Sequence, residues 1–277
     1  MVHSERLSGP DRRVHISPLG HYLDRVWEVP IREDADRLWL VTDAESSGGS
    51  SREYRRAVVA HLRKVAPRME IATERTEFWN FEEVVQTFSH IMHREVEAGN
   101  RVWVNISAGT KLQAVAGHLA AMAWGATSYY VIATTRPRPA RRVSPRGRGS
   151  PLPTAWGYGG KIELPYHRLD RPDPGGLEVL RQLRFIGATG EVWRPKKHLL
   201  RAMEIHDMAG RMRVNRVLEN LSKFPPKVEQ RGATRTRIVR LTKEGMLTLL
   251  LFGNDGVPHL SGTDSVPREA VAGAPLG

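Results

Sequence analysis

The sequence predicts an α/β protein with a Rossmann-like, mainly parallel sheet, followed by a small winged helix-turn-helix domain. From residue 12 to about 170, short apolar runs alternate with segments of helical periodicity. Several of these runs are apolar on both faces, which is typical of parallel strands covered by helices on both sides. Over 173–255, three short helical segments precede a basic hairpin-like segment and a further helix, the order expected of a winged helix-turn-helix.

The first domain, expected over 12–170, should alternate strands and helices along the chain. Pro30 should kink or end the first helix, because proline has no amide hydrogen to donate. Asn80 should cap the third helix, and Gly99 suits the left-handed residue that ends one. The expected strands are 14–19, 37–42, 69–72 with an extension toward 78, 101–106, 127–133 and an edge strand at 161–166; the expected helices are 21–32, 52–66, 80–96 and 110–124.

The second domain, expected over 173–255, follows a Pro- and Gly-rich linker at 170–176. Pro195 can occupy the first position of its second helix. Two short strands should be joined at Gly232, which precedes a final apolar helix. The expected helices are 177–186, 195–205, 208–222 and 243–252.

Composition restricts the possible chemistry. The 277 residues include no cysteine, which excludes disulfides, thiolate metal sites and cysteine nucleophiles. The eleven histidines form no HExxH motif, so we expect neither a metal site nor a cofactor. The chain contains no apolar run of about eighteen residues and no secretory signal, so we expect a cytoplasmic protein without membrane contact.

Positive charge predicts a polyanionic partner. The net charge is +12, and 173–253 alone holds sixteen Lys and Arg against eight Asp and Glu. The segment 134–160 adds six Arg and no acid, with enough Pro and Gly to predict a long flexible loop. This loop is either a solvated insertion or a basic flap beside a ligand or DNA. The tail over 256–277 is expected to be disordered.

The most informative segment is 101–111, RVWVNISAGTK, which precedes a helix of small residues. The strand, tight turn and helix start leave backbone N–H groups and the positive end of a helix dipole pointing into one crevice. Ser107, Thr110 and Lys111 stand beside them, so this turn suits an anionic, phosphate-bearing ligand. The alternative is that Thr110 only caps the helix and Lys111 is a solvated first-turn residue.

With this motif between a Rossmann-like half and a basic helix-hairpin half, the chain resembles the CRISPR-associated Rossmann-fold (CARF) regulators that carry a C-terminal winged helix-turn-helix. In that family the fourth strand commonly ends in Asn-x-Ser/Thr-Gly-Gly-Thr-Lys, and a short turn follows the first strand, as Ser17-Pro18-Leu19-Gly20 does here. The resemblance covers about 12–255. Ala108 stands where the family often has its first glycine, a substitution that matters if the position needs positive φ.

The resemblance implies a homodimer whose two-fold pocket binds a cyclic oligoadenylate, and a ligand-responsive transcriptional regulator in CRISPR antiviral defence. The regulatory ligand would be a cyclic oligonucleotide, and the second partner would be double-stranded DNA. By this resemblance the candidate ligand-binding residues are Leu19, Gly20, Asn105, Ser107, Ala108, Gly109, Thr110 and Lys111.

The candidate DNA-binding residues come from the helix at 208–222 and from the hairpin after it. Arg can pair with guanine and Asn with adenine in the major groove, and basic residues of a wing contact phosphates or the minor groove. The alternative is a solvated helix face. The candidates are Arg211, Arg213, Asn215, Arg216, Arg231, Arg235 and Arg237.

Two enzymatic alternatives remain open, although we expect no catalytic residues. Arg201 and His206 match the Arg-x4-His spacing of HEPN ribonucleases, which are longer and all-helical. The Rossmann-like half could also act as a ring nuclease on a bound cyclic nucleotide. Neither a carboxylate nor a histidine lies within the 105–111 turn, so cleavage there would rely on positioning.

Overall fold

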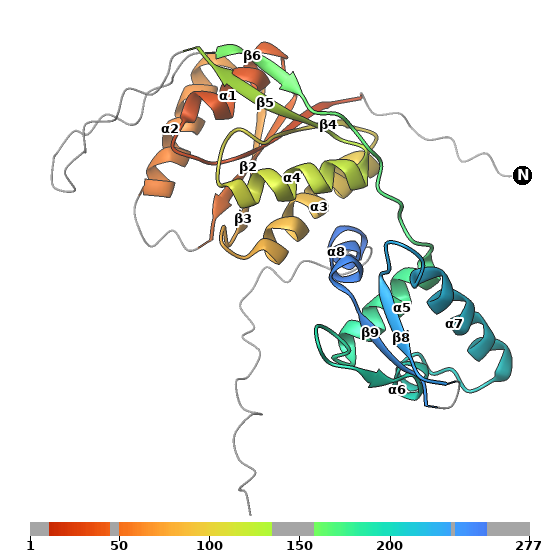
Figure 1. The fold of residues 1–277 in the computed structure, drawn as a ribbon. Helices are drawn as coiled ribbons and strands as arrows, with labels where there is room; N and C mark the ends of the chain where they lie inside the picture. Colours follow the sequence, from red (N-terminus) through yellow and green to blue (C-terminus); the bar gives the residue numbers. More distant parts are fainter. Residues whose placement is uncertain (1–10, 45–49, 135–157, 234–235, 254–277) are drawn as a thin grey trace, which may run out of the picture.

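The computed structural model describes residues 11–44, 50–134, 158–233 and 236–253 (Figure 1). Among these residues the chain forms a six-stranded sheet followed by a three-stranded sheet. The predicted flexible loop over 134–160 and the predicted disordered tail over 256–277 fall almost wholly outside the described residues.

The large sheet has the strand order β3-β2-β1-β4-β5-β6, and all neighbours are parallel except β5 and β6. This confirms the predicted Rossmann-like, mainly parallel architecture, with the antiparallel strand at one edge. The strands are β1 (Arg13–Pro18), β2 (Arg37–Asp43), β3 (Glu70–Thr76), β4 (Arg101–Asn105), β5 (Thr127–Ala133) and β6 (Tyr158–Glu163).

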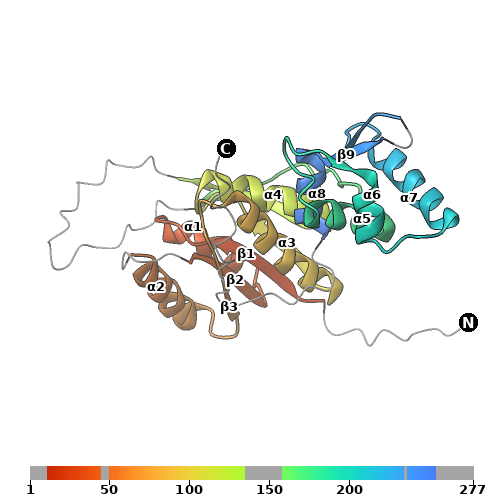
Figure 2. The same cartoon turned by 90° about the horizontal axis from the view of Figure 1, so that it is seen from below.

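Helices cover both faces of this sheet (Figure 2). On one face, α1 and α2 pack on side chains such as Leu38 and Leu40 of β2. On the other, α3 and α4 pack on alternate side chains such as Ile16 and Val104. Strand side chains therefore alternate between two apolar cores, which is why the runs are apolar on both faces. These helices are α1 (Leu23–Arg32), α2 (Ser50–Val65), α3 (Phe81–Glu97) and α4 (Lys111–Trp124).

Helix boundaries follow the predicted caps. The Asn80 side chain accepts from the Glu83 amide at 3.3 Å, and Gly99 takes a left-handed φ of +80° after α3. Pro30 lies inside α1, which ends two residues later at Arg32, the limit expected from the sequence. Because proline has no N–H, the Val26 carbonyl oxygen has no bond from residue 30.

The second part of the chain builds a smaller core from three helices and a hairpin. The strand order is β7-β9-β8, with both pairs antiparallel, and Gly232 follows β8 at a φ of +87°. The two-residue strand β7 was not predicted, and Pro195 precedes its helix as the N-cap residue. The elements are α5 (Pro174–Phe185), β7 (Arg194–Pro195), α6 (Lys196–Ala202), α7 (Met208–Leu221), β8 (Val228–Arg231), β9 (Ile238–Leu241) and α8 (Lys243–Phe252).

The last helix belongs to both cores. Leu249 of α8 packs with the smaller core, whereas Leu250, Leu251 and Phe252 are buried among α3 and α4 of the large one. Ser89 on α3 donates to the Leu251 carbonyl oxygen. The two sheets are therefore connected by continuous apolar packing, as well as by the 164–173 segment.

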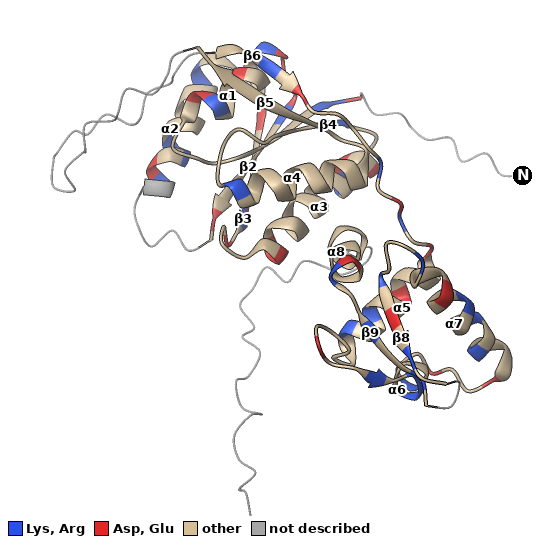
Figure 3. Ribbon diagram, in the orientation of Figure 1, with Lys and Arg blue, Asp and Glu red and all other residues tan. Residues whose placement is uncertain are grey.

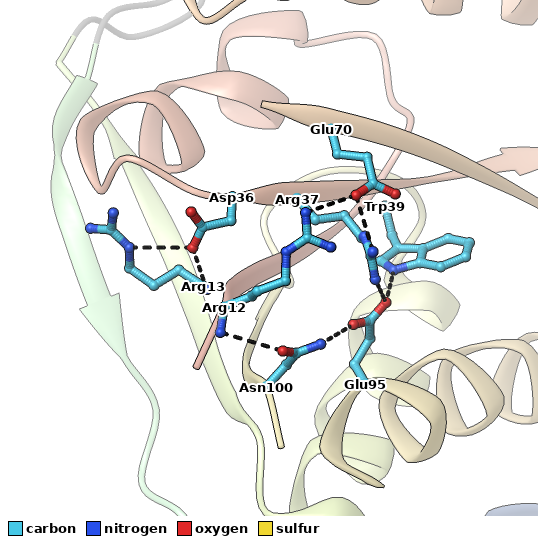
Figure 4. Close-up of polar contacts among 8 residues, drawn as sticks. All are labelled: Arg12, Arg13, Asp36, Arg37, Trp39, Glu70, Glu95 and Asn100. Carbon is cyan, nitrogen blue, oxygen red and sulfur yellow. Dashed lines mark hydrogen bonds and ion pairs between the residues drawn. The ribbon is translucent and has the colours of Figure 1, made fainter. Parts of the chain in front are cut away.

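An ion-pair network covers the amino-terminal edge of the large sheet (Figure 4). Glu95, which is 1% exposed, accepts from Arg37 at 2.6 Å and from the Trp39 indole at 2.7 Å. It also accepts from the Asn100 amide at 2.7 Å. Arg37 continues to Glu70 at 3.0 Å and, through this hydrogen bond, lowers the pKa of that carboxyl group. Every charge of the network therefore faces a partner of opposite sign.

Candidate functional site

A cavity of about 780 Å³ opens at the carboxyl ends of β1 and β4. The strand order reverses between these two strands, since β1 leads outward to β2 and β4 leads outward to β5. In open α/β sheets this switch point is where ligands bind. The turn after β1 and the turn after β4 both line the cavity, so the structure brings together the two segments that the sequence singled out.

Asn105 organises the second turn from inside. It is 1% exposed, and its side-chain amide donates to the Ser17 hydroxyl at 3.0 Å and to the Arg25 carbonyl oxygen. Its side-chain oxygen accepts from the amide of Ser107 at 2.9 Å and from its hydroxyl at 2.5 Å. Asn105 does not line the cavity, so its role in the structure is to hold the turn, whereas Ser107 lines the cavity.

Glycine is required where the two turns meet. Gly109 has a φ of +76°, and a Cβ atom there would lie 2.3 Å from Gln113 Oε1 and 2.7 Å from Pro18 Cβ. A Cβ at Gly20 would lie 2.6 Å from the Gly109 nitrogen. Ala108, by contrast, does not have positive φ and is buried with Leu19 in the core under α1 and α2. Ala108 therefore fits its position without backbone strain.

Thr110 begins α4 with a full capping box. Its hydroxyl accepts from the Gln113 amide at 3.2 Å, and its own amide donates to Gln113 Oε1 at 2.7 Å. The capping interpretation of Thr110 is thus correct, and its amide is not free for an anion. The first-turn amides of Lys111 and Leu112 have no intrahelical acceptor and carry the positive end of the dipole. Lys111 is exposed at the cavity.

The structure adds a cation that the sequence analysis missed. Arg25 of α1 lines the cavity, donates to the Ser107 carbonyl oxygen at 3.4 Å and stacks on Tyr22 at 4.8 Å. Its Nε atom is buried without a hydrogen-bond partner among the described residues. Buried donors without a partner are uncommon in folded proteins, and this one can donate to water or to a ligand in the cavity. No motif around Arg25 in the sequence indicated this position.

Aromatic side chains form much of the remaining wall. Trp79, which is 74% exposed, and Phe78 come from the segment between β3 and α3, and Tyr54 comes from α2. His21 Nδ1 lies 3.2 Å from the Tyr54 hydroxyl, and Asp43 from the end of β2 also faces the cavity. The cavity therefore combines basic side chains and the start of a helix with flat apolar surfaces, and it also contains a histidine and a carboxylate that lie outside the 105–111 turn.

The candidate DNA-binding residues lie in the second part of the chain, where Figure 3 shows basic segments on α6 and α7. Arg211, Arg213 and Arg216 of α7 are exposed. Asn215 is half-buried and accepts from Lys196 Nζ at 3.0 Å. Burial, and then the charges of the nearby Arg237 and Arg211, lower the pKa of Lys196.

The hairpin residues differ in their surroundings. The Arg231 guanidinium stacks on the Trp193 ring at 4.4 Å and is exposed, so its direction is fixed by the ring. Arg237 is half-buried, with Nη1 lying 3.5 Å from Gln230 Oε1. Arg235 lies outside the described residues.

The residues proposed for HEPN chemistry show no built site. Arg201 near the end of α6 and His206 before α7 are both exposed. Among the described residues no group of three His, Asp or Glu side chains could hold a metal ion. The described helices include none that is long and apolar enough to cross a membrane.

Comparison with known proteins gives distant similarities. A family model described as "HFX_2341_N:-like, N-terminal" matches residues 13–136, which is less than half of the chain. No curated protein matches the chain.

Three similar solved structures are larger chains. One is Can2 from Sulfobacillus thermosulfidooxidans in complex with cyclic tetra-adenylate, at 16% identity and a TM-score of 0.36 over 43% of this chain and 31% of that chain. Another is Enterococcus italicus Csm6 bound to cyclic hexa-2'-fluoro-hexa-dAMP, at 14% identity and a TM-score of 0.39 over 44% and 33%. The third is a type III CRISPR defence DNA nuclease activated by cyclic oligoadenylate, at 15% identity and a TM-score of 0.38 over 79% and 30%. The chain therefore spans about a third of the length of each, and these values are too low to transfer a function.

Proposed function

We propose that this protein is a DNA-binding transcriptional regulator whose Rossmann-like unit senses a cyclic oligoadenylate-type second messenger. The observation that carries the proposal is the cavity between β1 and β4, in which a helix N-terminus, two cations and aromatic side chains face one space. Phosphates bind helix N-termini and basic side chains, and bases stack on aromatic rings. The choice of a cyclic oligoadenylate, and the link to CRISPR antiviral signalling, rest on the CARF-like motif at 105–111.

A second copy of the chain would complete this site. Val115 of α4 and Tyr130 of β5 are 53% and 42% exposed at the cavity wall. Exposed apolar side chains beside a ligand site are typical of an interaction surface. A two-fold axis there would present each phosphate-binding group twice to a symmetric cyclic ligand. We therefore include a homodimer in the proposal.

The second part of the chain supports the DNA-binding role. Its order of α5, β7, α6, α7 and the β8–β9 hairpin agrees with a winged helix-turn-helix, with α7 as the recognition helix. Domain limits of 12–170 and 173–255 suit this assignment, although α8 packs on both units. The strands of the hairpin favour this assignment over an all-helical HEPN ribonuclease.

A packed route connects the cavity with the second unit. Helix α4 starts at the anion-binding turn and ends at Trp124, whose indole donates to Ser89 at 2.6 Å and whose ring lies 5.6 Å from that of Phe252. A ligand that favours one position of α4 would thereby change how the paired α7 helices meet DNA, provided it binds one arrangement more tightly.

The ligand proposal predicts that the purified protein binds a cyclic oligoadenylate and that Lys111→Ala with Thr110→Ala abolishes binding. Calorimetry with each available ring size measures this. Loss of the Thr110 cap costs about 1 kcal/mol of stability, so melting curves must show that the variant stays folded. Lys64→Ala, which removes an exposed lysine of α2 outside the cavity, should bind like wild type. Absence of binding by wild type with every ring size contradicts the sensor proposal and leaves the DNA proposal intact.

The DNA proposal predicts salt-sensitive binding of duplex DNA by the full-length chain. Each phosphate contact removed should reduce the slope of log K against log salt by roughly 0.9. We expect Arg213→Ala with Arg216→Ala to lower both affinity and slope, and Lys64→Ala to change neither. Failure of wild type to bind any duplex at low salt contradicts this part of the proposal.

Cleavage of the bound ligand is a second candidate, because His21 and Asp43 both line the cavity. Incubation of labelled cyclic oligoadenylate with the protein, followed by chromatography of the products, tests it. Cleavage that is lost in His21→Ala while binding is retained would add a ring-nuclease activity to the sensor. An intact ligand after prolonged incubation would leave binding as its only role.

A further inference from the structure

Two methionines stand on the outer surface of α7. Met208 is 70% exposed and Met212 is 62% exposed, although the helix offers a core in which Val214 and Leu218 are buried. Residues four apart lie one turn above each other, so the two thioethers form a single apolar strip on the first half of the helix. That strip contributes nothing to the core of the unit.

The surroundings of this strip are cationic. Arg211 lies between the two methionines in sequence, and Arg213 and Arg216 follow in the next turn, all exposed. None of the three forms an ion pair with an acid among the residues that the structure describes. The nearest preceding acid, Asp207, is the N-cap residue and accepts from the Gly210 amide at 3.2 Å. An apolar protein partner would have to bury these unpaired guanidinium groups at high cost, whereas a polyanion would neutralise them.

Duplex DNA offers an apolar feature at the place where such a strip would lie. The 5-methyl group of thymine projects into the major groove and is read by apolar side chains. The first residues of a recognition helix reach the base edges, and Met208 is the first residue of α7. Methionine is unbranched and polarizable, so its thioether can follow a methyl group without fixed geometry.

We propose that Met208 and Met212 determine sequence specificity by contacting thymine methyl groups in the major groove, while the neighbouring arginines hold the phosphates and guanines. This inference rests on the DNA-binding role proposed above. The inference assigns two roles to α7. The arginines determine the affinity and its salt dependence, and the methionines determine the preference for thymine over a base without the methyl group.

The test starts with selection of bound duplexes from a random pool by the full-length chain. Thymines in the selected site are then replaced one at a time by deoxyuridine, which removes only the 5-methyl group. We expect one or two positions at which wild type loses roughly fourfold in affinity, the equivalent of about 0.8 kcal/mol for one buried methyl-sized group. Met208→Ala or Met212→Ala should bind thymine and deoxyuridine sites equally.

Control variants keep the result specific. Leucine substitutions of the same two methionines retain an apolar side chain and should retain the discrimination. Phe224→Ala removes a 95% exposed apolar side chain beyond the end of α7 and should leave it unchanged. If wild type binds duplexes but ignores every deoxyuridine substitution, the methionine inference is wrong and the DNA proposal stands. If wild type binds no duplex, both are wrong.

Discussion

The amino-terminal and carboxyl-terminal edges of the large sheet, where its parallel strands begin and end, differ in how their charged side chains are paired. At the amino-terminal edge, Glu95, Arg37 and Glu70 form ion pairs with one another, although Arg37 Nε is buried without a hydrogen-bond partner among the described residues. At the carboxyl-terminal edge, Arg25 keeps a buried Nε without a partner, and Lys111 stands exposed beside a large cavity. The difference lies in charge and access: the charges of Glu95, Arg37 and Glu70 are neutralised within the protein, whereas Arg25 and Lys111 form no ion pair with an acid among the described residues and line a cavity that a ligand can enter.

We expect the largest loss of stability from removing Glu95, the central acid of the ion-pair network at the amino-terminal edge. Glu95→Ala removes the acceptor shared by Arg37, Trp39 and Asn100 and leaves these donors buried or half-buried. We expect a loss of about 3–5 kcal/mol in the free energy of unfolding, measured by urea denaturation. Glu70→Ala is the matched control: its side chain is 47% exposed, so the loss should be about 1 kcal/mol or less. Equal losses in the two variants would show that burial of Glu95 is not what makes it important.

The buried His15, on β1, predicts that the folded protein loses stability in acid. His15 on β1 is fully buried, with Trp103 stacked at 5.4 Å, Tyr129 Oη at 3.2 Å and Glu33 at 3.6 Å. Burial, together with the charges of Lys161 and Arg13, lowers its pKa from 6.5 to about 3. Between these values the unfolded chain binds the proton and the folded chain does not. Stability should therefore fall as pH drops below 6.5, by up to about 1.4 kcal/mol per pH unit.

Comparison of His15→Phe with wild type isolates this contribution. Urea denaturation at pH 7 and at pH 4.5 gives the difference in unfolding free energy for each protein. The variant should lose less stability than wild type between the two pH values, even if it is less stable at both. Parallel losses would assign the acid sensitivity to carboxyl groups instead.

A single added methyl group can change the turn after β4, at the carboxyl-terminal edge of the sheet. Gly109→Ala places a Cβ atom against Gln113 and Pro18 and forces alanine into positive φ, so the turn must move. The left-handed backbone alone costs about 1–2 kcal/mol, and ligand binding should be lost. Gly99→Ala has the same backbone cost at a φ of +80° but meets no atom within 4 Å, so it should keep ligand binding. Calorimetry and urea denaturation of both variants separate the shape of the turn from stability.

Much of the fold could be predicted because its signals are local. Apolar runs gave the β5 strand with its observed limits, and side chains that favour caps located Asn80 and Thr110 at helix starts. The strand β7 has only two residues and carries no pattern of its own, since it exists by pairing with β9.

The candidate site was predictable only in part. The two turns were found because glycine and hydroxyl residues at a strand end have a local meaning. Arg25, Tyr54 and Trp79 come from separate helices and loops, and only the order of the strands brings them to one cavity. Asn105 is a case in which the residue type misled the prediction. Its side chain could contact a ligand, but all of its hydrogen bonds are made within the protein.

The shared helix α8 has a consequence for biosynthesis. Ser89 and Leu251 are hydrogen-bonded across 162 residues of sequence, and Phe252 fills the core beneath α3 and α4. The chain is synthesised from its amino terminus, so the part of the Rossmann-like unit that α8 covers stays exposed until α8 has been made. We therefore expect a chain interrupted before α8 to be a target for chaperones and proteases.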